Sequence, residues 1–548
     1  MSLKNFLLVN ILIFSSVAIS AQQSKSEINR NEVNLNFDDD DFLFDLGRGP
    51  VRQACSGANI IIPSLFECKI LDILKNDIFF KTNDLNGRSL LDMPLFQTSF
   101  PKDDALTINL NFFFNKTDRS YFTEHSNKIC SYLALVNSPL EKSIVTSFTT
   151  ILNSECGDFI INTLGIPSSV FKTNVNALFG LFSNGTVEER RAGFMADIYK
   201  SVGSWTVGLK VPIYWRERNL FLSQGEIDAI QKAGLVFESS PNDAEDFQSN
   251  HIISDKVGFG DARIFAAYQF LDKNDATISL GAQVTIPSAL AVQKGVVGSE
   301  FRECLKDPSL DLCDILNLGL DPASLKRRVF QELGIFGIDF LDRLSAMLSD
   351  CSLGNKGHWG LGLFLEPAFN FNNSLAWRTH LSVEQLLPAG ELRFFTKKFD
   401  EAAFDAHNFA SSDEVIAEEN LRFINQRILD MFFPTPLCIN VLPGIIVFCS
   451  NYLTYTPVPS FSAMIGLDYW YQGQERFSIS SHSTAFDGYN VEKARNPWAQ
   501  QLKILGGASY NRGTPDNGWI LSLNGDITIF STGIGKDYTL ALSIKRTW

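Results

Sequence analysis

The residues with the clearest potential for catalysis are the six histidines and the nucleophilic side chains near them. His482 stands between Ser481 and Ser483, which would supply a general base and a nucleophile if their side chains met. Neighbours in a chain do not by themselves bring two side chains into contact, and a hydrolase needs its catalytic groups to converge. We therefore predict that the protein is not an enzyme, with no catalytic residue and no cofactor.

Nine cysteines form a second group of reactive side chains. No C-x-x-C spacing and no Cys/His cluster occurs, so we predict no metal site. Most of the cysteines fall into near pairs, as is typical of disulfides in an exported protein. Cys351 is left over and could replace a partner in the third pair, because spacing cannot determine connectivity. The candidate disulfide residues are Cys55 with Cys68, Cys130 with Cys156, Cys304 with Cys313, and Cys438 with Cys449.

A third group consists of charged residues at alternate positions of otherwise apolar segments. From Trp205 to Trp215, apolar residues occupy one face and Lys210 lies on the other. A period of two is that of a β-strand with unlike faces, and this length suits a tilted membrane strand of about 9 to 11 residues. The polar faces would then line a lumen. The predicted lumen-lining residues, our candidates for a pore, are Asp197, Lys210, Asp261, Arg263, Glu366, Arg378, His380, Glu384, Asp468, Lys503, Asp526 and Lys545.

These lumen candidates comprise six acids, five bases and His380. A charge inside a membrane protein is costly unless it is paired or meets water, so we expect ion pairs across the lumen. Such pairs would narrow a pore and make its charge selectivity weak. The alternative is that they only fill the interior.

Eleven segments carry this alternation and must position the charged residues. The last of them ends on the aromatic Trp548 and resembles the closing strand of Gram-negative outer-membrane proteins. That resemblance implies that Trp548 is an assembly signal read by the barrel-assembly machinery. Tight polar links at Ser201 to Gly203, Asp272 to Asp275 and Asn372 to Ser374 predict antiparallel hairpins. The segments are 105–115, 192–200, 204–215, 257–271, 276–287, 359–371, 375–387, 461–472, 499–511, 518–530 and 538–548.

The connections test this topology, because bacterial barrels have short periplasmic turns and long outer loops. Each strand crosses the membrane once, so counting strands tells on which side each connection lies. The count forward from a periplasmic N-terminal start and the count back from a periplasmic C-terminus assign the same sides everywhere except across 388–460. One more strand must lie there, at Glu391 to Phe399 or around Val441 to Tyr455. We predict an all-β fold with helical insertions, a transmembrane antiparallel β-barrel of about 12 strands within a range of about 10 to 14. A soluble, secreted α+β protein is the alternative.

The segments outside the strands define the remaining organisation. Residues 1–22 resemble a cleaved signal peptide, since the apolar run is too short to span a bilayer; an N-terminal membrane anchor is the alternative. Residues 23–104 would form a periplasmic extension or a plug, and 105–548 the barrel. Helical patterning occurs at Leu325 to Leu348 and at Ser411 to Phe432, the second opening with the capping-box spacing of Ser411 and Glu414. The long outer loops are expected at 116–191, 216–256, 288–358 and 388–460.

The net charge of −14 argues against nucleic-acid binding, which needs a basic face. The expected partners are outer-membrane lipid, the barrel-assembly machinery and a small-molecule solute, and the oligomeric state stays open. The expected location is the outer membrane, after export.

One hairpin carries a family resemblance. It contains Gly-Phe-Gly-Asp at 258–261, Ala-Tyr-Gln-Phe-Leu at 267–271 and Thr-Ile-Pro-Ser at 285–288. Over about thirty residues it resembles the outer-membrane channels associated with phenol-degradation pathways. The resemblance implies a barrel that passes small, often hydrophobic molecules, although the long Cys-bearing inserts depart from that family and could occlude the mouth.

These observations predict an outer-membrane channel for passive uptake or efflux of small solutes, hydrophobic ones among them. The alternative is a non-conducting surface barrel that displays disulfide-stapled loops for adhesion or envelope structure.

Overall fold

The computed structural model describes residues 88–93, 104–119, 186–221, 253–273, 275–294, 352–409, 411, 413–478, 486–513 and 518–548, all within the compact unit Ala54–Trp548. Several predictions fall outside these residues: the signal peptide, the helix from Leu325 to Leu348, and His482 with its two serines. The cysteines other than Cys438 and Cys449 lie outside them as well.

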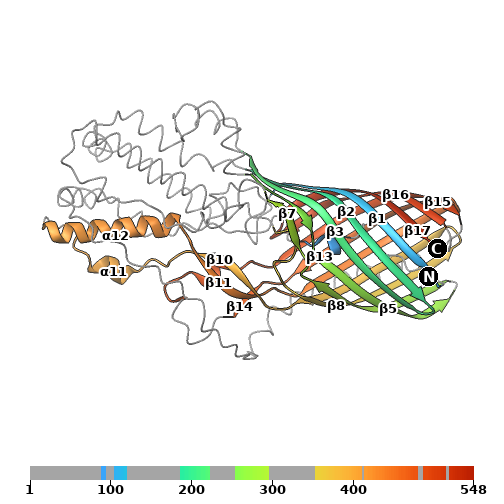
Figure 1. Ribbon diagram of the computed structural model, residues 1–548, viewed down its shortest axis with the longest axis horizontal. Helices are drawn as coiled ribbons and strands as arrows, with labels where there is room; N and C mark the ends of the chain where they lie inside the picture. Colours follow the sequence, from blue (N-terminus) through green and yellow to red (C-terminus); the bar gives the residue numbers. More distant parts are fainter. Residues whose placement is uncertain are drawn as a thin grey trace. The chain divides into compact units, whose positions relative to one another are not determined.

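Twelve antiparallel strands close into a barrel (Figure 1), which confirms the predicted fold class. Each strand pairs with the next one around the ring, and β1 completes it by pairing with both β2 and β17. In ring order the strands are β1 (Leu106–Arg119), β2 (Thr186–Val202), β3 (Trp205–Phe221), β5 (Ala262–Lys273), β6 (Ala276–Ile286), β8 (Gly360–Asn372), β9 (Leu375–Leu386), β12 (Ile446–Val458), β13 (Phe461–Gln472), β15 (Ala499–Gly513), β16 (Gly518–Thr532) and β17 (Lys536–Thr547).

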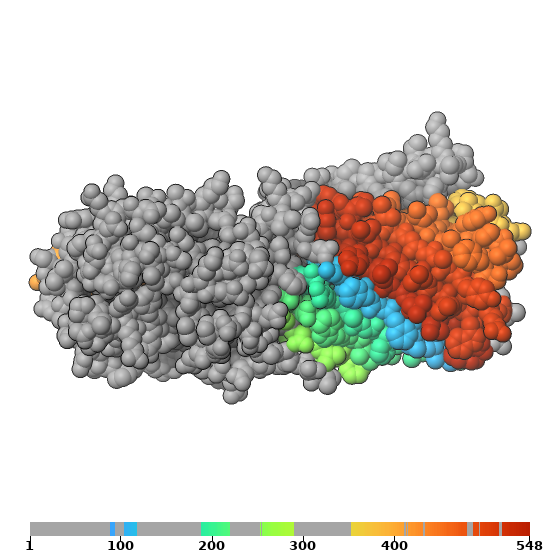
Figure 2. Space-filling model, turned by 90° about the horizontal axis from the view of Figure 1, so that it is seen from above, coloured from blue at the N-terminus to red at the C-terminus, as the bar shows by residue number. Residues whose placement is uncertain are grey.

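The ring closes at the seam between β1 and β17. The backbone N–H of Trp548 donates to the Leu106 carbonyl at 3.0 Å, and the Leu106 N–H donates to the Trp548 carbonyl at 3.1 Å. From there the antiparallel register continues through the pair Leu110 and Ile544. Figure 2 shows β1, in blue, lying between the green of β2 and β3 and the red C-terminal strands. Closure leaves no edge strand in this wall, so the backbone groups have partners without water.

The tight turns and the C-terminus lie at one end of the barrel, as the topological count predicts. The β2–β3 turn contains Gly203, whose φ of 56° lies in the left-handed region that favours glycine. The missing strand is β12, which confirms the second of its two predicted positions. The first position instead forms β10 (Ala389–Phe395), which pairs with β11 (Thr435–Leu442) and, through it, with β14 (Arg476–Ser478) in a separate sheet.

The strands extend further toward the loop end than the sequence predicted. β1 runs to Arg119, β2 begins at Thr186 and β3 runs to Phe221, so the predicted loops 116–191 and 216–256 are too long. The predicted strand 257–271 is interrupted: β4 (Ile253–Phe259) pairs with the end of β3, and β5 follows after Gly260 and Asp261. Beyond β6, the short β7 (Leu290–Lys294) pairs with β4.

The outward faces of the strands are apolar. Leu540 and Leu542 on β17 are exposed, while the intervening Ala541 is buried. Aromatic side chains gather on the outer surface near the turn end, among them Trp205, Trp519 and Trp548. An apolar band bordered by aromatic residues is the surface of a barrel that faces lipid.

The described helices lie outside the barrel strands: η2 (Leu90–Asp92) precedes β1, and α11 (Glu401–Ala406), α12 (Glu414–Phe432) and α13 (Val491–Ala494) lie in connections. The helix predicted from Ser411 is α12, but its N-cap is Asp413, whose carboxylate accepts from the N–H groups of Val415 and Ile416 at 3.0 and 3.3 Å. The predicted capping box of Ser411 is therefore wrong, since a carboxylate closer to the first turn takes its place. No helix in the described ranges is long and apolar enough to cross a membrane.

Cys438 and Cys449 are both free thiols, so the predicted disulfide between them is a second correction. Cys449 is buried on the barrel strand β12, where its Sγ accepts a hydrogen bond from Asn451 at 3.3 Å. Cys438 is exposed on β11, which belongs to the other sheet. The prediction rested on the closeness of the two cysteines in the sequence, but the chain passes from the separate sheet to the barrel between them.

If the exterior faces lipid, a charged substitution on it should destabilise the barrel more at mid-barrel than near the turn end. Leu523, 62% exposed on β16, faces outward, and Leu523→Arg should destabilise the barrel by about 2–4 kcal/mol, because a guanidinium would then face hydrocarbon. Tyr510→Arg, at an outward position that is 55% exposed near the turn end, is the matched control and should cost about 0–1 kcal/mol. Urea unfolding in phospholipid vesicles measures both, and equal costs would contradict a lipid-facing band.

Candidate functional site in the barrel interior

The structure brings the predicted lumen-lining residues to the inner side of the wall. On β17 the burial alternates as expected, with Thr539, Ala541 and Ser543 buried between exposed leucines. The candidates on the other strands are likewise buried or half-buried. Asp261 differs, because it lies at the break between β4 and β5 and accepts a hydrogen bond from the Asn355 N–H at 2.6 Å.

Ion pairs join inward side chains of nearby strands along the wall. Lys503 on β15 binds Asp526 on β16 at 3.0 Å and Asp537 on β17 at 2.8 Å, and all three side chains are buried. Asp537 was missed because the predicted strand began at residue 538. Extending the inward alternation of β17 by one step would have found it.

A second group of polar contacts surrounds Glu384 on β9. Its carboxylate pairs with Arg263 of β5 at 2.5 Å and accepts from Thr285 and Gln283 of β6 at 2.6 and 3.2 Å. These residues come from three strands, so the cluster spans an arc of the wall.

Other lumen candidates contact amide groups, a histidine or aromatic rings. Asp197 accepts from Asn109 and Asn111 of β1 at 3.3 and 3.2 Å. His380 meets Glu366 at 2.7 Å. Lys210 lies 5.8 Å from the centroid of the Phe265 ring, Lys545 lies 5.7 Å from that of Tyr199, and Arg378 stands opposite Tyr452 in the β9–β12 register.

The centre of the lumen is occupied by residues 88–93, a part of the chain that belongs to no strand. Arg88, Leu91 and Met93 are almost completely buried. The apolar side chains of this segment pack in one cluster with Phe113, Met195, Tyr214, Leu505 and Ala541, which come from β1, β2, β3, β15 and β17. We call residues 88–93 the lumen segment. For the rest of 23–104, the choice between an extension and a plug stays a prediction.

Polar contacts hold both ends of the lumen segment. Arg88 forms a fully buried ion pair with Asp468 on β13, and its Nη2 donates to the Asp92 carbonyl at 2.5 Å. Asp92 pairs with Arg263 at 2.8 Å, which joins the segment to the Glu384 cluster. Between these ends Ser89 caps η2 by accepting from the Leu91 N–H at 3.2 Å. The segment thus presents one cation and one anion to opposite charges on the wall.

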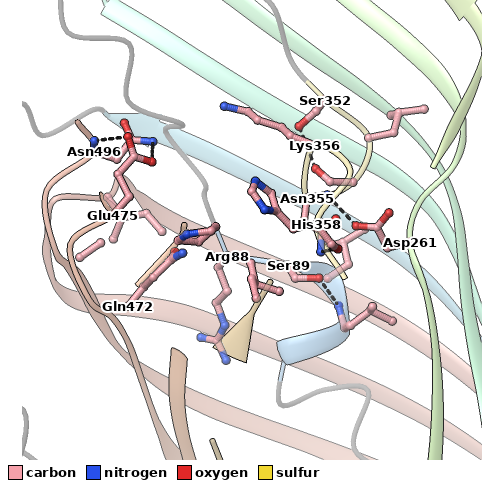
Figure 3. Close-up of a pocket in the computed structure, with 18 of the residues that line it drawn as sticks. Arg88, Ser89, Asp261, Ser352, Asn355, Lys356, His358, Gln472, Glu475 and Asn496 are labelled. Atoms are coloured by element: carbon pink, nitrogen blue, oxygen red, sulfur yellow. Dashed lines mark hydrogen bonds between the residues drawn. The ribbon is translucent and has the colours of Figure 1, made fainter. Parts of the chain in front are cut away.

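A cavity of about 150 Å³ adjoins the lumen segment (Figure 3). Its lining includes Arg88, Asp261, His358 and Glu475, and Asn496 donates to Glu475 from its backbone N–H at 2.6 Å. A second space near Asp92 measures about 20 Å³. The larger volume has room for a few water molecules.

An arginine cluster lies beside this cavity. The Glu189 carboxylate on β2 pairs with Arg191 at 2.9 Å, with Arg216 at 2.9 Å and with Arg218 at 2.8 Å. Arg191 also donates to the Arg88 carbonyl at 3.1 Å. The wall therefore binds the backbone of the lumen segment as well as its side chains.

His358 links the loop before β8 to the separate sheet. Its Nε2 lies 2.8 Å from the Glu391 carboxylate and its Nδ1 lies 2.7 Å from the Leu387 carbonyl. Burial alone would raise the pKa of Glu391, but Lys356, the hydrogen bond from His358 and Arg393 outweigh it and lower this pKa to about 2. Glu391 is thus an ionised carboxylate.

In the described part of the chain, no group of three or more His, Cys, Asp or Glu side chains could hold a metal ion.

Comparison with known proteins adds solved structures of low similarity. No protein-family model and no curated protein sequence matches the chain. An outer membrane channel from Pseudomonas putida F1 is 9% identical over 83% of this chain and 99% of that one, with a TM-score of 0.39. The Ralstonia pickettii toluene transporter TbuX is 10% identical over 81% and 89%, with a TM-score of 0.28. The transport unit of the Escherichia coli autotransporter AIDA-I is 6% identical over 83% and 95%, with a TM-score of 0.31.

The pKa of Glu391 predicts an acid-sensitive link. Because the folded pKa of about 2 lies below the ordinary 4.5, the link stabilises the fold above pH of about 4.5 and loses this effect as the pH falls through about 2. The difference corresponds to about 3 kcal/mol. Unfolding free energies between pH 7 and 2 should fall less steeply for Glu391→Gln than for the parent chain. Parallel curves would contradict the assignment.

Proposed function

We propose that this protein is an outer-membrane channel for small solutes, and that the lumen segment closes its path in the structure described here. The observation that carries the proposal is the occupancy of the lumen. Wall side chains alone do not fill the interior; a segment from outside the strands does. A space filled by a separable part of the chain becomes a passage when that part moves.

The contacts of the lumen segment support a reversible closure. Its two ionic contacts join side chains far apart in the sequence, Arg88 with Asp468 and Asp92 with Arg263. When the segment moves, Arg263 keeps Glu384 and Lys503 keeps both of its aspartates, so much of the wall stays paired. The backbone hydrogen bonds between neighbouring barrel strands do not involve the segment. The barrel wall can therefore stay folded when the segment leaves the lumen.

The surroundings of the barrel support the location. Its apolar outer band fits lipid, and its aromatic residues at the turn end fit a membrane interface. Trp548 is exposed beside the closing seam, where an assembly machinery could read it. Export by a cleaved signal peptide, passive uptake or efflux, and a hydrophobic cargo belong to the same proposal. The charged inner wall also suits small polar solutes.

The alternative is a non-conducting barrel that displays its loops for adhesion or envelope structure. This alternative requires the lumen segment to stay in place. The buried ion pair of Arg88 and the small cavity volumes are the observations that favour it. The two proposals differ in one respect, whether the lumen segment leaves.

Loosening the segment without altering the wall separates them. Leu91→Asp removes about 2 kcal/mol of apolar burial and places a carboxylate in the apolar cluster, so the segment should leave the lumen far more often. Purified protein in planar bilayers should then spend at least about ten times more time conducting, since about 1.4 kcal/mol is a factor of ten.

Val415→Asp, at an apolar side chain 75% exposed on α12, is the matched control and should leave conduction at the parent level. Heat-modifiable migration on a gel verifies that each variant is folded. A folded Leu91→Asp barrel that never conducts would overturn the channel and leave the display barrel.

A further inference from the structure

The guanidinium of Arg88 is bound by a site that three neighbouring wall strands build. Asp468 of β13 forms the ion pair, and the Gln501 Oε1 of β15 lies 3.4 Å from the Arg88 Nη1. The Phe448 ring of β12 lies against the guanidinium, with its centroid 5.1 Å from the Arg88 Cζ. A carboxylate at the edge and an aromatic face are the contacts that guanidinium groups favour.

The wall holds two parts of this site in place without help from Arg88. The Gln501 Nε2 donates to Asp537 at 2.7 Å and to the Gly535 carbonyl at 3.1 Å, which turns the Oε1 toward the site. Phe448 is packed in a buried cluster with Trp470 and Leu386. The site is therefore pre-organised, as binding sites with fixed selectivity require.

The charges of the wall make the vacated site selective for cations. Lys503 stands near but is already bound by Asp526 and Asp537 at 3.0 and 2.8 Å. The second carboxylate oxygen of Asp468, Oδ1, is buried and has no hydrogen-bond partner among the residues that the structure describes. Departure of Arg88 thus leaves a buried carboxylate without its ion pair, which is costly until another cation arrives.

The opposite end of the lumen segment behaves differently. When Asp92 departs, its partner Arg263 still has Glu384 at 2.5 Å. Departure of the lumen segment therefore removes the ion pair of Asp468 but leaves Arg263 with an acid. This asymmetry distinguishes a cation site from a general polar lining.

We propose that Asp468, Gln501 and Phe448 form a recognition site for a guanidinium-bearing solute, and that Arg88 occupies it in the closed channel as the chain's own substitute for that solute. This inference rests on the proposed channel and names the class of solute. A guanidinium solute would compete with Arg88 for the same carboxylate and ring, so binding of the solute would also favour release of the lumen segment.

Block of the open channel tests the site. With Leu91→Asp barrels in planar bilayers, millimolar methylguanidinium should reduce the potassium current in a saturable way, at concentrations at least about tenfold lower than methylammonium, which lacks the planar fork. Adding Asp468→Asn should abolish this difference. Asp197→Asn, which removes another buried acid of the lumen, is the control and should retain the block. Conduction that methylguanidinium and methylammonium affect equally would overturn the inference and leave the channel standing.

A second measurement does not depend on conduction. Arg88→Gly empties the site, and methylguanidinium at millimolar concentration should then raise the thermal unfolding midpoint of the detergent-solubilised barrel, while the parent chain, whose site is filled, shows no rise. Arg88→Gly with Asp468→Asn should show no rise either. If Leu91→Asp never conducts but this rescue occurs, the channel fails and the guanidinium site stands. If the rescue is absent, the site itself is wrong.

Discussion

Closure of the ring between β1 and β17 is the constraint on which the rest of this structure depends. A wall with an apolar exterior cannot leave backbone N–H and C=O groups unpaired where no water reaches them, and only a complete ring pairs them all. The hydrogen bonds between Leu106 and Trp548 begin that last pairing. Once the ring is closed, every strand has an inner and an outer face, and the alternation of residue types acquires its meaning.

The inner face then sets an electrostatic problem that the chain solves in two ways. Some charges pair with the neighbouring strands, as Lys503 does with Asp526 and Asp537. Asp468 instead pairs with Arg88, which belongs to the lumen segment and not to a barrel strand. The same six residues that fill the centre of the lumen thus also form ion pairs with Asp468 and Arg263, so space filling and ion pairing are coupled in one segment.

That coupling links the closed structure to the proposed channel. Moving the lumen segment opens space and, at the same time, exposes a carboxylate framed by Gln501 and Phe448. The packing of the interior, its charge asymmetry and its proposed solute therefore follow from the contacts of one segment.

The sequence by itself determined the strands, their faces, the common side of the tight turns and the need for a twelfth strand, because a period of two and a short turn are local properties. It also placed the charged residues inside, since inward and outward positions follow from the same alternation. Only the tertiary structure decided which charges meet. Arg88 and Asp468 are 380 residues apart in the chain, and their contact depends on the register of every strand between them. The free thiols of Cys438 and Cys449 depend on which sheet each residue joins, and the entry of residues 88–93 into the lumen depends on how the closed ring is filled. No local pattern encodes either.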